Sequence, residues 1–172
     1  QTALVKTCME KVGVGTSVFS PKAILNAISR AKDRLLTADQ YSGTGGGYFE
    51  ECVAKVYAEY EKGLVENNAF DFDDLIMRTV GLLRGTKELL ESYSERFEHI
   101  LVDEYQDTSH AQYELVNLLS SKHRNICVVG DDDQSIYGWR GADISNILDF
   151  EHDHPDAVVL RLEQNYRSTG NI

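Results

Sequence analysis

Three short apolar runs in the second half of the chain constrain its fold most strongly. They cover residues 100–102, 126–129 and 158–162, and stretches with helical spacing separate them. Short apolar runs of this kind predict strands buried on both faces, and their alternation with helices predicts a parallel sheet with right-handed crossovers. We therefore expect an α/β unit with three layers, in which helices cover both faces of the sheet.

Each apolar run is followed at once by polar residues. Asp103 and Glu104 follow the first run, a cluster ending at Gln134 follows the second, and one ending at Arg167 follows the third. Because the carboxyl ends of parallel strands share one edge of a sheet, we expect these clusters to converge on one site. Adjacent carboxylates there suit nucleotide hydrolysis, since one can hold hydrated Mg²⁺ and the other can activate water. On the pair alone, a solvated loop is an equally good interpretation.

The first half of the chain has the apolar spacing of helices. Ser20 is a candidate N-cap with proline at the next position, and Asp71 is a candidate N-cap within the sequence D-F-D-D-L. The glycine-rich stretch at 42–47 lacks the Gly-Lys-Ser/Thr ending of a phosphate-binding loop and predicts a surface loop. Helices are expected over residues 2–11, from Pro21 onward, over 48–67, from Asp71 onward, over 87–97, after an N-cap at Thr108 or Ser109, and over 142–150.

Composition and charge narrow the class of protein. A hydrophobic content of 42% and a charged content of 26% are ordinary for a soluble globular protein, and no apolar run is long enough to span a bilayer. The net charge of −11 argues against a free-standing nucleic-acid binder, which usually carries a basic patch. The cysteines at positions 8, 52 and 127 are far apart, which predicts buried thiols and a cytoplasmic protein without a membrane association.

Three long motifs closely resemble those of the UvrD/Rep/PcrA-type superfamily 1 DNA helicases. They are D-E-Y-Q-D-T from Asp103, V-V-G-D-D-D-Q-S-I-Y-G-W-R-G-A-D from Val128 and L-E-Q-N-Y-R-S-T from Leu162, and the D-F-D-D-L stretch fits the same family. The resemblance covers nearly all of the chain. It implies part of a RecA-like motor domain of the P-loop NTPase type over residues 97–172, and a mainly helical insertion subdomain over residues 1–96.

The resemblance also implies roles for the residues that would handle ATP. Asp103 would coordinate Mg²⁺, and Glu104 would activate the hydrolytic water. Gln134 would sense the γ-phosphate, Arg167 would contact it as an arginine finger, and Tyr166 would stack on the adenine. A planar guanidinium suits the charge that develops on a transferred phosphoryl group.

A second group of residues would contact DNA if the resemblance holds. Tyr137, Trp139 and Arg140 would lie along a single strand, with Trp139 stacking on a base. An exposed aromatic ring beside arginine suits base stacking that tolerates any sequence. The alternative for Trp139 is a core tryptophan, but glycines on both sides of the Trp-Arg pair favour a loop.

The chain departs from the family's pattern because it contains no G-x-x-x-x-G-K-[ST] phosphate loop. We therefore expect an internal fragment of an ATP-dependent, 3′-to-5′ DNA helicase that acts in DNA repair or replication, and we expect the fragment alone to be inactive. Its expected partners are single-stranded and duplex-junction DNA, the remaining helicase domains, and repair or replication proteins. Two alternatives are a nucleotide-free protein-interaction module and the helicase part of a recombination helicase–nuclease.

Overall fold

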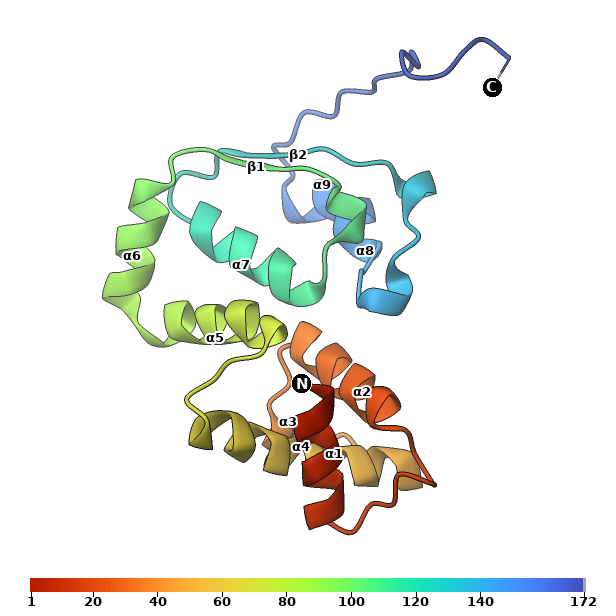
Figure 1. The fold of residues 1–172 in the computed structure, drawn as a ribbon. Coiled ribbons are helices and arrows are strands. Elements are labelled where there is room, and N and C mark those ends of the chain that lie inside the picture. The colour runs from red at the N-terminus through yellow and green to blue at the C-terminus, as the bar shows by residue number, and fades with distance from the viewer. Residues whose placement is uncertain (172) are drawn as a thin grey trace.

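The computed structural model describes residues 1–171, and its elements form two groups (Figure 1). The first group contains α1 (Thr2–Lys11), α2 (Pro21–Asp33), α3 (Ala38–Ser42) and α4 (Tyr48–Glu66). The second contains α5 (Phe72–Gly85), α6 (Lys87–Arg96), β1 (Ile100–Val102), α7 (His110–Ser120), β2 (Ile126–Val128), α8 (Ser145–Leu148) and α9 (Phe150–Asp153). Helix α5 lies between α2 and α7 and so joins the groups. Ile172, the last residue of the expected motor-domain part, lies outside the described residues.

One apolar core holds the first group together. It consists of side chains from α1, α2 and α4, which face each other at helical spacing; among them are Val5, Met9, Ile24, Ile28, Val53, Val56, Tyr57 and Tyr60. Full burial of one such side chain contributes about 1.5–3 kcal/mol relative to leaving it exposed. Tyr57 and Tyr60 of α4 therefore belong to the core of the helical group, whereas Tyr48 at the start of α4 is exposed.

Two predicted helix starts are confirmed by their caps. The Ser20 hydroxyl oxygen accepts a hydrogen bond from the Ala23 backbone N–H at 3.1 Å, and Pro21 is the first residue of α2. The Asp71 carboxylate accepts one from the Asp74 N–H at 2.8 Å at the start of α5. Each side chain satisfies a backbone donor that has no partner within the helix.

A buried lysine links three of the helices. The Lys32 side chain of α2 is 0% exposed, and its Nζ lies 2.8 Å from Glu61, 2.8 Å from Asp71 and 3.0 Å from Asp74. Burial alone would lower the pKa of Lys32, but hydrogen bonds to Asp71 and Glu61 and the surrounding carboxylates raise it. Lys32 therefore stays charged and holds α2, α4 and α5 at a fixed distance from one another.

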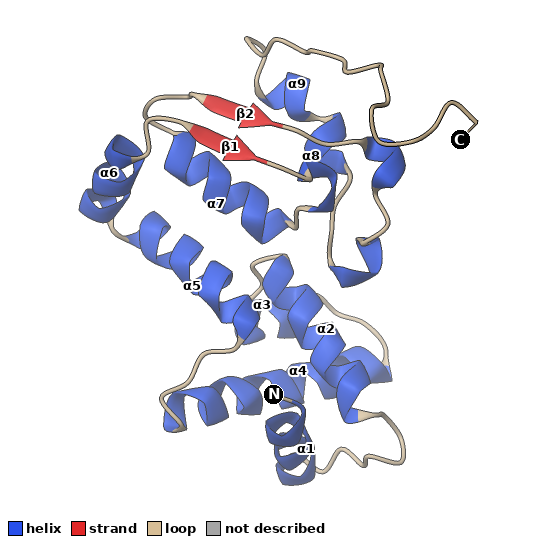
Figure 2. Cartoon of the chain, turned by 45° about the horizontal axis from the view of Figure 1, so that its top comes forward, coloured by secondary structure: helices blue, strands red, loops and turns tan. Residues whose placement is uncertain are grey.

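The two strands are parallel and short. Ile100 pairs with Ile126, Leu101 with Cys127 and Val102 with Val128. Figure 2 shows α7 beside this pair of strands. Leu101, however, is 78% exposed, so the prediction that β1 is buried on both faces is wrong for the described residues.

The third predicted strand is not formed. Residues 158–162 follow α9 as an irregular segment that leaves the body of the molecule (Figure 1), and Val158 and Leu162 are 83% and 91% exposed. An apolar run supplies strand propensity, but a strand also needs a neighbour that pairs with its backbone. Among the described residues the sheet has two strands, β1 and β2.

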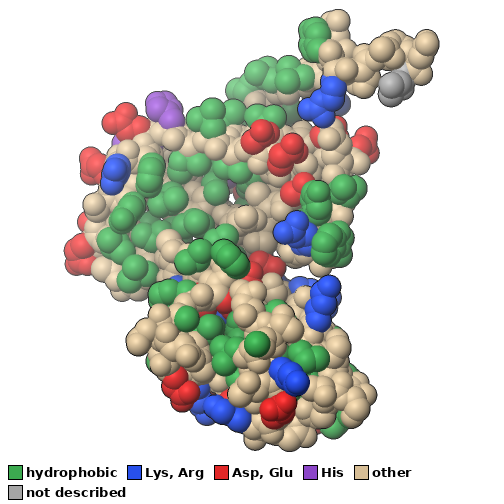
Figure 3. Space-filling view, in the orientation of Figure 1, with side chains coloured by type: hydrophobic (Ala, Val, Ile, Leu, Met, Phe, Trp, Pro, Cys, Tyr) green, Lys and Arg blue, Asp and Glu red, His purple; other side chains and the backbone are tan. Residues whose placement is uncertain are grey.

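Two smaller predictions also need correction. The helix expected over residues 142–150 is two shorter helices, α8 and α9, because the chain bends at Asp149. Cys8 and Cys52 are buried as predicted, whereas Cys127 lies exposed on β2. The second group presents many apolar side chains at its surface in Figure 3. None of the described helices has both the length and the apolar character needed to cross a membrane.

Candidate functional site

The polar clusters that follow β1 and β2 lie side by side. The Val129 N–H donates to the Val102 carbonyl at 2.8 Å, and the Tyr105 N–H donates to the Val129 carbonyl at 3.0 Å. The pairing therefore continues beyond the strands and brings Asp103 and Glu104 next to Gly130 and Asp131. Two of the three predicted clusters converge on one edge of the sheet.

Both carboxylates after β1 are exposed, and the backbone at the second is unusual. Glu104 has φ 50° and ψ 43°, the left-handed conformation that residues with a side chain rarely adopt. Its N–H donates to the Asp103 carboxylate at 2.9 Å. A left-handed residue of this type costs about 1–3 kcal/mol, and such strain concentrates at functional sites.

Gln106 connects the two clusters. Its side chain is buried, donates from Nε2 to the Glu104 carboxylate at 2.9 Å, and accepts from the Asp131 backbone N–H at 3.1 Å. Gly130 leaves the room for this amide, because a Cβ there would lie 2.5 Å from the Gln106 side-chain oxygen. The end of β2 therefore has to pass close to Gln106, and a glycine permits it.

The turn after β2 holds Gln134 through Asp131. This single 3₁₀ turn (Asp132–Gln134) begins with the Asp131 carboxylate accepting from the Asp133 N–H at 3.1 Å. The second carboxylate oxygen accepts from the Gln134 side-chain amide at 2.6 Å. Gln134 thus lies on the same edge as Glu104, and Asp131 and Gln106 stand between them.

Tyr137, Trp139 and Arg140 gather at a further 3₁₀ turn (Gly138–Arg140), which begins after Tyr137; we call residues 137–141 the aromatic turn. Trp139 is 74% exposed, which excludes the core interpretation of this residue. The Arg140 guanidinium carbon lies 5.7 Å from the centre of the Tyr137 ring and 5.6 Å from that of Trp139. These distances allow cation–π attraction, which keeps the flat side chains together at the surface.

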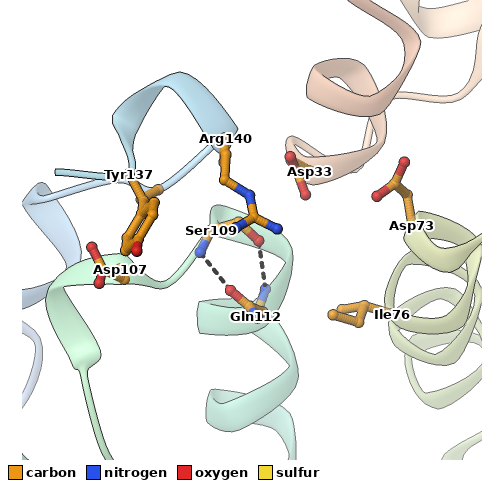
Figure 4. A pocket seen from close by; sticks show the side chains of 9 residues that line it. Asp33, Asp73, Ile76, Asp107, Ser109, Gln112, Tyr137 and Arg140 are labelled. Carbon is orange, nitrogen blue, oxygen red and sulfur yellow. Dashed lines mark hydrogen bonds between the residues drawn. The ribbon is translucent and has the colours of Figure 1, made fainter. Parts of the chain in front are cut away.

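The aromatic turn packs against the helical group. Gly141 ends the turn with φ 92°, and a Cβ at this position would collide with the Asp33 carboxylate of α2. A cavity of about 350 Å³ lies where α2, α5 and the turn meet. In Figure 4, Arg140 points between Asp33 and Asp73 on one side and Tyr137 on the other.

The cavity raises the pKa of both aspartates that line it, Asp33 and Asp73. Burial and the nearby Asp73 carboxylate raise the pKa of Asp33 to about 6. Burial also raises the pKa of Asp73. Both groups hold their protons more tightly than an exposed aspartate does, because the cavity is a poor solvent for two negative charges.

Tyr166 and Arg167 lie apart from the other candidate residues. They belong to the exposed segment that follows α9 and extends away from the sheet (Figure 1). Their hydrogen bonds are local: the Tyr166 hydroxyl donates to Gln164 at 3.4 Å, and the Arg167 N–H donates to Asn165 at 2.8 Å. The described structure therefore does not bring them to Asp103 and Glu104.

Sequence reasoning gave no role to Gln106, Asp131, Asp33 or Asp73. Gln106 and Asp131 stand within the motifs, so their position was a signal, but their contact spans 25 residues of sequence and depends on strand pairing. Asp33 and Asp73 come from different helices and meet only through packing. Asp73 stands within the D-F-D-D-L motif, but no pattern in the sequence pairs it with Asp33.

Comparison with known proteins shows the family of the chain. Residues 1–155 match the UvrD/REP helicase N-terminal domain. The ATP-dependent DNA helicase PcrA of Bacillus subtilis is 50% identical over all 172 residues of this chain, which cover 23% of that protein. The PcrA helicases of Staphylococcus epidermidis and Staphylococcus aureus are 49% identical over the same residues, 24% of their length. The chain thus spans about a quarter of these relatives, and it belongs to the UvrD/REP helicase N-terminal domain family.

Proposed function

We propose that this chain is part of the motor of an ATP-dependent DNA helicase. One observation carries the proposal: the two carboxylates after β1 lie beside the turn that carries Gln134, at the edge where parallel α/β sheets bind ligands. The names of the PcrA relatives, ATP-dependent DNA helicases, support ATP-dependent helicase activity and DNA as the substrate. Their names do not favour an interaction module without nucleotide.

We assign Mg²⁺ coordination to Asp103. One of its carboxylate oxygens accepts the Glu104 N–H, and the other has no protein partner among the described residues. This fits Mg²⁺, which keeps several waters and binds one or two carboxylates together with phosphate oxygens. The described residues contain no group of three His, Cys, Asp or Glu side chains suited to a metal ion, and such a site does not require one.

We assign the activation of water to Glu104. Its carboxylate is exposed at the strand end, and its hydrogen bond to Gln106 fixes one oxygen while the other can accept a proton. General-base catalysis of this kind contributes roughly 10²–10⁴-fold to a rate. The left-handed backbone at Glu104, which costs stability, supports this assignment because such strain concentrates at functional sites.

The remaining nucleotide contacts would come from two segments. Gln134 would contact the γ-phosphate from the turn after β2. Tyr166 and Arg167 would contact the adenine and the γ-phosphate if the segment after α9 lay against the sheet.

The phosphate cradle and its lysine would come from outside this chain. Residues 97–172 would form part of a three-layer RecA-like motor domain, and residues 1–96 would form its helical insertion.

Single-stranded DNA would pass over the aromatic turn. Tyr137 and Trp139 offer flat faces to bases, and Arg140 offers charge to the backbone, on a chain that is otherwise acidic. The helicase would move in the 3′-to-5′ direction and act on duplex junctions in the cytoplasm, during repair or replication.

The test is ATP hydrolysis and strand separation by the full-length protein. We expect hydrolysis that requires Mg²⁺ and is stimulated by single-stranded DNA, and unwinding of a duplex with a 3′ tail in preference to one with a 5′ tail. A protein that binds DNA but hydrolyses no ATP under any of these conditions contradicts the proposal.

A further inference from the structure

We propose that Gln106 is a positioning residue that holds the Glu104 carboxylate and ties it to the turn that carries Gln134. The inference rests on the proposed function, because it concerns the same site. It assigns a task to a residue that would touch neither ATP nor water.

The network fixes the orientation of the Gln106 amide. Carboxylates only accept hydrogen bonds, so the nitrogen must face Glu104, at 2.9 Å, and Asp107, at 3.5 Å. A backbone N–H only donates, so the oxygen must face Asp131. The reverse orientation would set an oxygen against a carboxylate and a nitrogen against an N–H, and it is excluded.

The amide has little freedom to move. Gln106 is 1% exposed, and its own carbonyl accepts a hydrogen bond from the Ser135 hydroxyl at 3.4 Å. Gly130 packs so closely on the side-chain oxygen that even a methyl group there would displace it. A buried amide with both ends occupied transmits a shift on one side to the other, because a broken hydrogen bond in the interior is costly.

The contacts form one continuous path between the two strand ends. It runs from the Glu104 carboxylate through the Gln106 amide to the Asp131 backbone, and from the Asp131 carboxylate to the Gln134 amide. The catalytic carboxylate and the residue proposed to contact the γ-phosphate are thus parts of one hydrogen-bonded unit. Loss of Gln106 should slow hydrolysis more than it weakens ATP binding, because Glu104 would act only after ATP is bound.

The experiment compares three variants of the full-length protein in steady-state ATP hydrolysis with saturating single-stranded DNA. Gln106→Met keeps the volume and removes the side-chain hydrogen bonds to Glu104, Asp107 and Asp131. We expect kcat to fall about tenfold to a hundredfold, the usual effect of losing an orienting residue, and the KM for ATP to change by less than about threefold. Gly130→Ala should lower kcat in the same direction, because it presses on the same amide without removing it.

The matched control is Asn146→Leu. Asn146 is also buried, and its side-chain amide donates to the Thr108 carbonyl at 3.0 Å and to the Thr108 hydroxyl at 3.1 Å. This variant loses a comparable buried amide in the same part of the molecule. It should lower thermal stability as Gln106→Met does and leave kcat near the wild-type value.

A double-mutant cycle separates positioning from general destabilisation. In a Glu104→Gln background, Gln106→Met should lower single-turnover hydrolysis by less than about twofold further, because residues that act as one unit are not additive. The inference is overturned if Gln106→Met loses as much activity in that background as alone. It is also overturned if Asn146→Leu loses as much as Gln106→Met.

The outcomes also separate this inference from the proposed function. If the wild-type protein hydrolyses ATP, Glu104→Gln does not, and Gln106→Met equals wild type, only the inference fails. If the wild-type protein hydrolyses no ATP with DNA, the proposed function fails first. If Gln106→Met does not fold, the kcat of Gly130→Ala tests the inference instead. An unchanged kcat in that variant contradicts the inference.

Discussion

The Lys32 ammonium nitrogen lies 2.8 Å from the Asp71 carboxylate, and both side chains are buried at the junction of α2 and α5. Asp71 also caps α5, so one carboxylate orders a helix start and neutralises a buried cation. The D-F-D-D-L motif therefore has a structural task that its capping pattern describes only in part. The junction it builds holds the helical group against the helix that leads to the sheet.

Lys32→Met should destabilise the protein by about 3–5 kcal/mol. Removing the ammonium leaves Asp71 buried without its cationic partner and Asp74 with Arg78 alone, and breaking a buried pair on one side costs this much. Urea denaturation measures the change. Lys62→Met is the control, because Lys62 forms an exposed pair with Glu59 whose loss should cost less than about 1 kcal/mol. Equal stability of the two variants would contradict the account of this junction.

The pH dependence of stability should report on Asp33. The folded state raises the pKa of Asp33 from 3.8 to about 6, so the folded state binds the proton more tightly than the unfolded chain does. This contribution to stability is fully present below about pH 4 and is lost as the pH rises through 6. Asp33→Asn should therefore stabilise the protein at pH 7 by about 1 kcal/mol, a figure reduced for solvent screening of a partly exposed group.

Denaturation of the Asp33→Asn variant at pH 4 and pH 7 checks this sign. The gain over wild type should be present at pH 7 and small at pH 4. Asp39→Asn, at an exposed position of α3, is the control. A variant that is less stable than wild type at pH 7 would show that the Asp33 charge is favourable in the cavity.

Trp139→Ala in the full-length protein should weaken binding to single-stranded DNA by about 1–3 kcal/mol, irrespective of sequence. The ring is exposed beside Arg140 and is free to stack on a base. The number of base pairs unwound per ATP should also fall, because the aromatic turn would hold the single-stranded DNA while the helicase moves. Fluorescence anisotropy with a labelled oligonucleotide measures the affinity.

Phe72→Ala is the control for Trp139, since Phe72 is an exposed aromatic residue at the start of α5. It should leave the affinity for DNA unchanged. If Trp139→Ala matched this control in both affinity and unwinding, the aromatic turn would not be the DNA contact.

Local chemistry made much of the fold predictable, and long-range contacts account for what was missed. The caps at Ser20 and Asp71 and the apolar stripe of α4 are encoded by residues a few positions apart, and the structure bears them out. The strand expected over residues 158–162 needed a partner strand, which no local pattern supplies. Contacts between residues within one helical turn can be predicted from the sequence, whereas contacts between residues far apart in the chain cannot.

In the candidate site, too, some features could be predicted from the sequence and others could not. Asp103, Glu104 and Gln134 follow apolar runs that form strands, so their convergence could be predicted from strand order alone. The Gln106 bridge could not, because it depends on a close approach at Gly130 and a left-handed backbone at Glu104. These are details of packing that the alternation of apolar and polar residues does not encode.

The 172-residue chain alone should show no measurable ATP hydrolysis, with or without single-stranded DNA. Phosphoryl transfer depends on positioning the phosphates and stabilising their charge, and this sequence has no phosphate loop. A phosphate-release assay at high protein concentration is sufficient, with the full-length protein as the positive control. DNA-stimulated turnover by the chain that disappears in Glu104→Gln would contradict the prediction.

Single-turnover hydrolysis by the Glu104→Gln variant of the full-length protein tests directly whether Glu104 activates the water. The carboxamide keeps the shape of the side chain but cannot take a proton from water. We expect ATP affinity to stay within about threefold of wild type while the rate of hydrolysis falls roughly 10²–10⁴-fold. A fall of less than about fivefold with unchanged ATP affinity would show that Glu104 does not activate the water, and would contradict the site described at the end of β1.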